Sequence, residues 1–232
     1  TTAISNSNYL FLKKSNILKP NSKLLWACKK MELYDSFKNL HNSKILNFNA
    51  KKLEDNILHI VTNKNLNKAL KEKIKNNKNI SIKSNKIVTK LFTQNGLKCV
   101  RTSDHKVFKY NLIIVCTGKN SSLIRNLLGN RHFKYDYNEV STTQVIKHKV
   151  TKNNIARQFF LREGPMAFLP ISKSQTSIVW SIKKNFLEKE KKNKENFIRK
   201  KIKNVSKEIY KDIKLAPKFE FNNLNFHLED KC

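Results

Sequence analysis

The chain has 232 residues, of which 39% are hydrophobic, which is enough for one large domain or two small domains with a real core. Its formal net charge is +31, yet only six of its 48 basic residues are arginine, the residue that nucleic-acid readers favour for bidentate contacts. Composition therefore predicts a globular fold. It also indicates that most of the charged side chains lie on the solvent-exposed surface and do not form a nucleic-acid interface.

The first third of the chain alternates short helices and strands. Residues 1–18 begin polar and pass into a helix-like run that Pro20 ends. The segment 63–75 has apolar residues at helical spacing, with Asn63 in the capping position. Between these helices we expect short strands at 31–34, 45–48 and 58–61.

The middle of the chain predicts four or five strands. They are expected at 80–82, 87–92, 97–101, 107–110 and 112–115. Asn95 and Gly96 are typical of a hairpin turn, and the run 112–115 is apolar on both faces, as in a buried parallel strand. Gly118 then turns the chain into a helix that Ser121 or Ser122 caps. A strand that ends in such a turn is a usual ligand site in an α/β sheet.

The last third predicts more strands and an amphipathic region. Residues 137–150 alternate as a half-buried strand, in which His148 is interpreted as structural. Between two β-rich runs, 155–161 and 176–182, Pro165 and Pro170 indicate that the segment 164–171 is an edge or a bend. Residues 185–210 predict an amphipathic helix or a broken pair of helices, and residues 216–226 predict one more strand.

The four cysteines do not indicate a metal site. Cys28, Cys99, Cys116 and Cys232 are too scattered for a zinc knuckle, and Cys99 and Cys116 fall in apolar runs, as reduced core cysteines do. A reducing cytoplasm fits this pattern. No apolar run approaches the length of a transmembrane helix, no signal peptide is evident, and the chain does not begin with Met.

The run ARQFFLREGPMAFLPIS followed by SIVWS resembles a signature of the FAD-dependent hydroxylases of ubiquinone biosynthesis. These enzymes belong to the para-hydroxybenzoate hydroxylase-like flavoprotein monooxygenases. The resemblance implies that the segment walls the substrate cavity beside the flavin, with Phe160, Pro165, Phe168 and Pro170 around the substrate. The matching residues are Ala156, Phe159 or Phe160, Gly164, Pro165, Ala167, Leu169, Pro170, Val179 and Trp180.

Two further stretches resemble the FAD-binding parts of this family. Asn63 matches a residue that approaches the flavin from a helix start, although a plain helix cap explains it equally. Thr117 and Gly118 match the second FAD motif, in which Thr117 replaces an Asp and one extra residue precedes Arg125. The resemblance thus implies that Asn63, Thr117 and Gly118 bind FAD, while Gly118 as a mere turn is the alternative.

The sequence lacks the family's GxGxxG and GDAAH motifs, which belong before and after the matched stretch, so the resemblance predicts a central fragment. The fold class that it implies is α/β (α+β), with an FAD-binding sheet interleaved with a mixed substrate-domain sheet. Residues 1–25 and 57–130 are assigned to the FAD-binding domain, and 26–56 and 131–232 to the substrate-binding domain.

The function implied by the resemblance is FAD-dependent hydroxylation of a polyprenylated phenol in ubiquinone biosynthesis. Molecular oxygen is the second substrate, and NAD(P)H or another donor supplies electrons. We expect no metal and no nucleic acid, with a ubiquinone-biosynthesis complex as a candidate partner and peripheral contact of a cytoplasmic protein with the inner membrane. The alternatives are a basic nucleic-acid-binding module and a degenerate, non-catalytic family member.

Overall fold

The computed structural model describes residues 1–18, 24–36, 43–50, 56–117, 123, 132–190, 193–217 and 219–229. The contacts of the chain group it into two compact units, which are described separately. The first unit comprises residues 1–77 and 138–224, and the second comprises 78–137 and 225–232. The domain boundaries predicted from the sequence differ from these units and stay a prediction. No helix among the described residues is both long enough and apolar enough to cross a bilayer.

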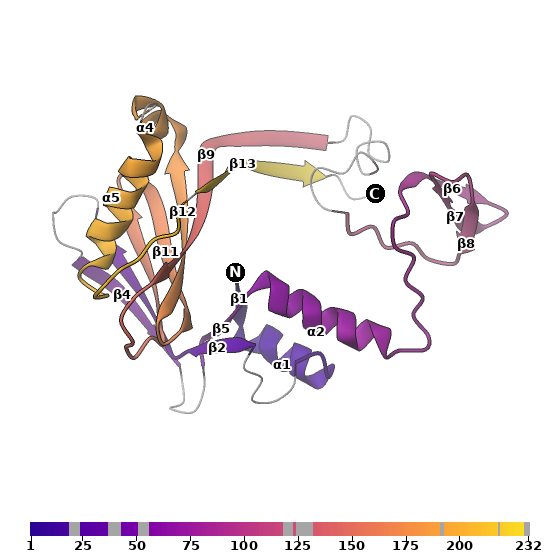
Figure 1. The fold of residues 1–232 in the computed structure, drawn as a ribbon. Coiled ribbons are helices and arrows are strands. Elements are labelled where there is room, and N and C mark those ends of the chain that lie inside the picture. The colour runs from indigo at the N-terminus through magenta and orange to yellow at the C-terminus, as the bar shows by residue number, and fades with distance from the viewer. Residues whose placement is uncertain are drawn as a thin grey trace. The chain divides into compact units, whose positions relative to one another are not determined.

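A seven-stranded mixed sheet dominates the first unit (Figure 1), with the order β13-β9-β12-β11-β10-β3-β4. All its neighbouring strands with a described register pair antiparallel except β3 and β10, which are parallel. The strands are β3 (Lys30–Asp35), β4 (Ser43–Asn49), β9 (His132–Lys147), β10 (Ile155–Leu161), β11 (Gly164–Ser172), β12 (Gln175–Lys183) and β13 (Glu220–Glu229).

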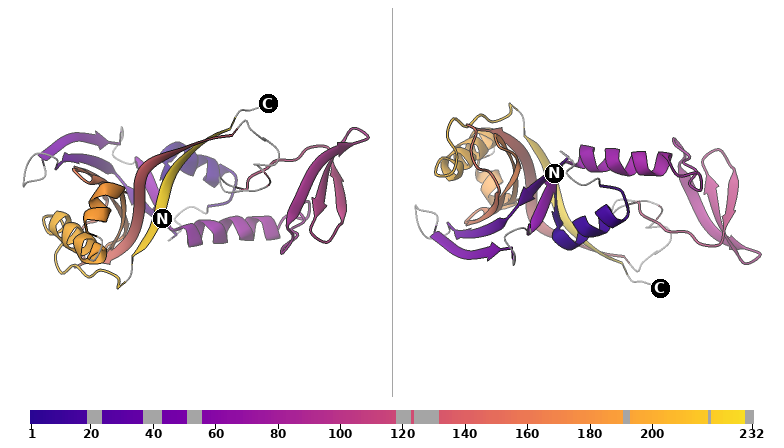
Figure 2. Two further views of the ribbon diagram at one scale, coloured as in Figure 1. Left: turned by 90° about the horizontal axis from the view of Figure 1, so that it is seen from above. Right: turned by 90° about the horizontal axis from the view of Figure 1, so that it is seen from below.

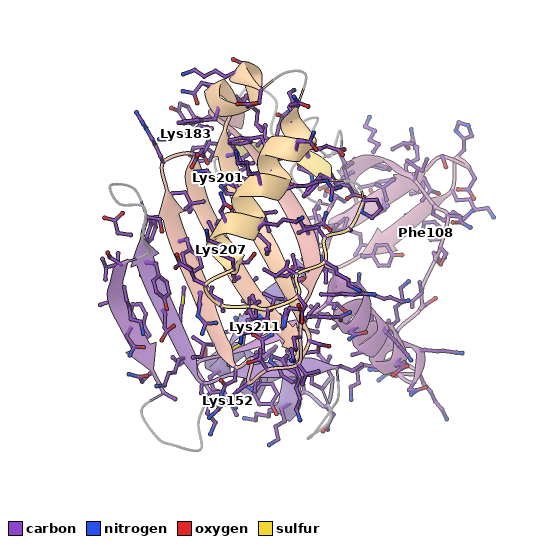
Figure 3. All side chains as sticks on the ribbon, turned by 60° about the vertical axis from the view of Figure 1, so that its left-hand side comes forward. Phe108, Lys152, Lys183, Lys201, Lys207 and Lys211 are labelled. Carbon is purple, nitrogen blue, oxygen red and sulfur yellow. The ribbon has the colours of Figure 1, made fainter. Side chains whose placement is uncertain are left out.

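One face of this sheet is covered by the helices α4 (Lys184–Lys189) and α5 (Lys194–Ser206). They confirm the predicted broken pair. Lys201 of α5, labelled in Figure 3, forms an ion pair with Glu163 in the β10–β11 turn, with 2.7 Å between Nζ and Oε1. The core beneath the helices is built by side chains that include Ile146, Phe159, Met166, Phe168, Ile178, Trp180, Ile182, Ile198 and Ile202.

A small three-stranded sheet lies on the other side of the large sheet, together with two helices (Figures 1 and 2). Its order is β1-β5-β2, and Ile60 and Cys28 pack against Ala156, Leu169 and Ile171 of the large sheet. The elements are β1 (Thr2–Ser5), α1 (Asn6–Lys14), β2 (Leu25–Cys28), β5 (Leu58–Val61) and α2 (Asn63–Lys75).

The prediction that residues 164–171 form an edge or a bend is wrong, because β11 lies between β10 and β12. Pro165 is the second residue of the strand and pairs with Phe160 beside a two-residue turn. Pro170 pairs with Thr176 next to a register shift and lies beyond the stretch of β11 that pairs with β10. Both prolines thus stand near strand ends, where the missing N–H disturbs the ladder least.

The second unit contains a three-stranded meander of β6 (Val88–Gln94), β7 (Leu97–Thr102) and β8 (Val107–Tyr110). Asn95 and Gly96 form the predicted hairpin turn, with φ values of 51° and 75°. The predicted strands at 80–82 and 112–115 are absent from the described structure. A buried parallel strand needs a paired strand on each side. No described residue pairs with residues 112–115. As a result, the side chains of Leu112 and Ile114 are 73% and 77% exposed. Cys116 is likewise exposed rather than in a core.

Candidate functional site

The two faces of the large sheet are built by alternating residues of the same strands. Phe159, Met166 and Trp180 face the helices and are 0–1% exposed. On the opposite face the small sheet covers only the end that contains Leu169 and Ile171. The described residues of the first unit place no helix or second sheet over the remaining part of that face, near the β10–β11 turn, and we call this part the uncovered face.

The uncovered face presents mainly apolar side chains together with a few polar ones, which include Gln158 of β10, Asp35 of β3 and Ser181 of β12. Phe160, which is 38% exposed, lies directly opposite Pro165 on the neighbouring strand. Gln158 lies opposite Ala167 and beside Leu33 of β3, and all three side chains are half-buried. An apolar surface that carries few polar groups is typical of the wall of a small-molecule site.

The structure brings only two of the four predicted substrate residues together. Phe160 and Pro165 are neighbours on the uncovered face, but Phe168 and Pro170 point to the helix-covered face. Phe168 is fully buried, and its ring centroid lies 5.1 Å from that of Phe159. Sequence analysis missed Gln158, although its place between Ala156 and Phe160 in an alternating strand could have indicated it.

Asn63 lies at the start of α2, as predicted, but it is not the cap. Thr62 is the N-cap, and its hydroxyl accepts a hydrogen bond from the Asn65 backbone N–H at 3.2 Å. The exposed Asn63 side chain accepts a hydrogen bond from the Thr2 hydroxyl at 2.7 Å through Oδ1. Among the described residues its Nδ2 group has no hydrogen-bond partner, so the side chain fits a donor role towards an electron-rich ring such as that of a flavin.

Of the other two predicted FAD residues, the structure describes only Thr117. Thr117 is exposed and belongs to the second unit, and Gly118 lies outside the described residues, as do Ser121, Ser122 and Arg125. Thr117 offers a hydroxyl in place of the carboxylate of the family motif, so it can donate or accept one hydrogen bond but supplies no charge.

A buried ionic network stands at the β3 edge of the helix-covered face. Glu32 accepts hydrogen bonds from Lys44 and Tyr34, each at 2.7 Å, and lies 3.3 Å from Arg157 Nε. Burial alone would raise the pKa of the Glu32 carboxyl, but the two hydrogen bonds and the Arg157 charge outweigh burial and lower it. Glu32 therefore stays ionised and fastens three neighbouring strands together.

Comparison with curated proteins finds partial sequence similarity to one kind of enzyme. The chain is 32% identical over 83 residues to the human mitochondrial ubiquinone biosynthesis monooxygenase COQ6, covering 35% of this chain and 18% of that protein. Its mouse counterpart is 36% identical over 84 residues, covering 35% and 17%. No protein-family profile matches the chain.

Comparison with solved structures shows the fold. PqsL from Pseudomonas aeruginosa, a probable FAD-dependent monooxygenase, superposes with a TM-score of 0.65 at 14% identity over 81% of this chain and 51% of that chain. The 2,6-dihydroxypyridine-3-hydroxylase from Arthrobacter nicotinovorans gives a TM-score of 0.54 at 15% identity over 78% and 46%. The chain thus spans about half the length of these structures.

Together the comparisons confirm the resemblance and the α/β (α+β) fold class predicted from the sequence. The curated relatives are monooxygenases by name, and PqsL is a probable FAD-dependent monooxygenase. Within that class, the sequence similarity is to the ubiquinone biosynthesis monooxygenases.

Proposed function

We propose that this chain forms the substrate-facing part of an FAD-dependent monooxygenase that hydroxylates the ring of a polyprenylated phenol in ubiquinone biosynthesis. The observation that supports the substrate class is the 32% identity to the human ubiquinone biosynthesis monooxygenase over 83 residues. The uncovered face supports the placement of the substrate, because a mainly apolar wall that carries a few polar groups suits an aromatic ring with a polar substituent.

The described side chains suggest a division of roles. FAD, when bound, would supply the oxygen-activating chemistry, with electrons from NAD(P)H or another donor. The start of α2 and the Asn63 amide would hold the flavin ring. Phe160 and Pro165 would cover one side of the phenol ring and exclude water from it. The Gln158 amide would hydrogen-bond the phenolic oxygen and so fix the orientation of the ring.

The experiment measures flavin and phenol binding in the protein at its natural full length. We expect bound flavin in the purified protein and hydroxylation of a short-chain polyprenyl phenol when a donor is added. Phe160→Ala should weaken phenol binding about tenfold, because part of the apolar contact is lost, while flavin content stays unchanged.

The matched control is Phe221→Ala on the outermost strand β13, because Phe221 is 39% exposed and Phe160 is 38% exposed. This substitution should leave phenol binding unchanged. A full-length protein that binds no flavin would contradict the proposal and favour the degenerate, non-catalytic alternative.

The nucleic-acid alternative has less support. In the β6–β8 meander the rings of Phe108 and Phe92 are covered by Lys83 and Arg101, whose charged groups lie 3.7 Å and 5.4 Å from the ring centroids. These faces are therefore occupied by the protein's own cations, whereas a base-stacking platform needs free aromatic faces.

A further inference from the structure

A second candidate binding site lies at the end of the large sheet where β9 ends and β11 turns into β12. The surface there forms a pocket of about 550 Å³. This size falls within the range of small-molecule sites, roughly 300–1,000 Å³. The pocket is lined by Lys147, His148, Lys149, Ser174, Gln175, Asp212 and Lys214.

Two of the lining lysines are held directly opposite each other. Lys147 and Lys214 form an antiparallel bridge in which each backbone N–H donates to the other residue's carbonyl, at 3.0 Å and 2.8 Å. Opposed residues in such a bridge carry their side chains on the same side, and like charges in this arrangement destabilise the pair. Within the described ranges, neither lysine pairs with a carboxylate.

A third lysine adds to this positive charge, and little opposes it. Lys149 lines the same pocket, and its backbone N–H is bonded to the Lys211 carbonyl at 3.0 Å. Asp212 is the only carboxylate among the lining residues. The folded chain thus holds three ammonium groups around one hollow, a repulsive arrangement that a bound anion would relieve.

The backbone beneath these lysines is fixed by a buried polar cluster. The His148 backbone N–H donates to the Ser174 carbonyl at 3.0 Å, and Nε2 of its ring lies 3.1 Å from the Thr176 hydroxyl. The His148 ring stacks on Tyr210 with 4.0 Å between centroids, and the Tyr210 hydroxyl donates to Asn153. The positions from which the lysine side chains extend are therefore set before any ligand arrives, which reduces the entropic cost of binding.

We propose that Lys147, Lys149 and Lys214 bind a phosphate group carried by a small molecule or a lipid headgroup. Lysine binds phosphate as a point charge, and the Ser174 hydroxyl adds a hydrogen-bond donor at the same pocket. The site stands at the turn end of the sheet, beside Lys211, which Figure 3 labels and which lines a neighbouring hollow together with Lys149. It does not depend on the proposed hydroxylase function.

The test measures thermal unfolding of the full chain in low salt while inorganic phosphate or glycerol 3-phosphate is added. Both ligands should raise the unfolding temperature of the native chain beyond the effect of sodium chloride at equal ionic strength. Lys214→Gln should raise the unfolding temperature without ligand, because the repulsion is relieved. It should also weaken phosphate binding about tenfold.

The control is Lys73→Gln in the last turn of α2, because Lys73 is exposed and forms no ion pair with another described residue, so this substitution should change neither quantity. Vesicles containing phosphatidic acid separate the two ligand sources. Retention of the native chain but not of Lys214→Gln would identify a lipid headgroup, and binding of glycerol 3-phosphate alone would identify a soluble ligand. Equal phosphate stabilisation of the native chain and Lys214→Gln, or stabilisation matched by sodium chloride, would overturn the proposal.

Discussion

The two faces of the large sheet come from the same strands but serve different purposes. On the helix-covered face, Phe168 and Trp180 are completely buried. On the uncovered face, Phe160 is one-third exposed beside Pro165, although it follows the buried Phe159 directly in the sequence. Alternation along a strand therefore lets one face stabilise the fold while the other stays free to bind a ligand.

The largest expected effect tests this contrast with one kind of substitution on each face. Phe168→Ala should destabilise the chain by about 3–5 kcal/mol, because it leaves a cavity in a closed core. Phe160→Ala should cost less than about 1 kcal/mol, because its ring already contacts solvent. Urea unfolding followed by the fluorescence of the buried Trp180 measures both, and equal losses would contradict the functional division of the faces.

The second prediction concerns Gly164, where β11 begins. Its φ is +133°, and an added Cβ would lie 2.1 Å from the Ser181 carbonyl oxygen of the neighbouring strand. Gly164→Ala should therefore cost about 3 kcal/mol and displace the carbonyl that accepts the Trp180 Nε1–H hydrogen bond.

Gly96 is the matched control for Gly164. It also has a positive φ, +75°, but an added Cβ would meet nothing within 4 Å. Gly96→Ala should cost about 1 kcal/mol, from backbone strain alone. If urea unfolding shows that the two substitutions lower the free energy of unfolding equally, the close approach of β11 and β12 contributes nothing to the cost of Gly164→Ala.

The third prediction, with a smaller expected effect than Phe168→Ala or Gly164→Ala, concerns Glu32 on the helix-covered face. Glu32→Gln should destabilise the chain by about 2 kcal/mol at pH 7, because two charge-assisted hydrogen bonds and an ion pair lose their anion. The lowered pKa of Glu32 means that its contribution is complete above the unfolded-state pKa and is lost as the pH falls through the folded-state value.

Unfolding experiments from pH 7 down to about pH 3 measure this dependence. The difference in stability between the native chain and Glu32→Gln should begin to shrink as the pH falls below the ordinary glutamate pKa of about 4.3, and should disappear once the pH has passed through the lowered folded-state pKa. A difference that stays constant with pH would mean that the carboxylate charge is not what stabilises this edge.

Periodicity and turn residues in the sequence predicted most strands and helices. The runs at 58–61, 97–101, 107–110 and 155–161 lie within one residue of the observed strands, because local pattern decides them. The position of β11 inside the sheet was missed because proline is generally excluded from the middle of a paired strand. Pro165 and Pro170 avoid this penalty because they lie near the two ends of β11.

The candidate site was predicted only in part. Resemblance pointed to the segment that forms β10 and β11, but motif matching does not record which face each residue occupies. Phe160 and Phe168 were therefore grouped together, although they lie on opposite faces of the sheet. The register of the strands separates them, and that register depends on pairing between distant parts of the chain.

The parallel pairing of β3 with β10 sets a constraint on folding order. β3 and β10 align residue 30 with residue 155, so the centre of the sheet cannot close until most of the chain has been synthesised. Pairings between residues so far apart in sequence give a high contact order and slow folding. Until β10 emerges, β3 has a free edge on the side away from β4, and such an edge can pair with another strand.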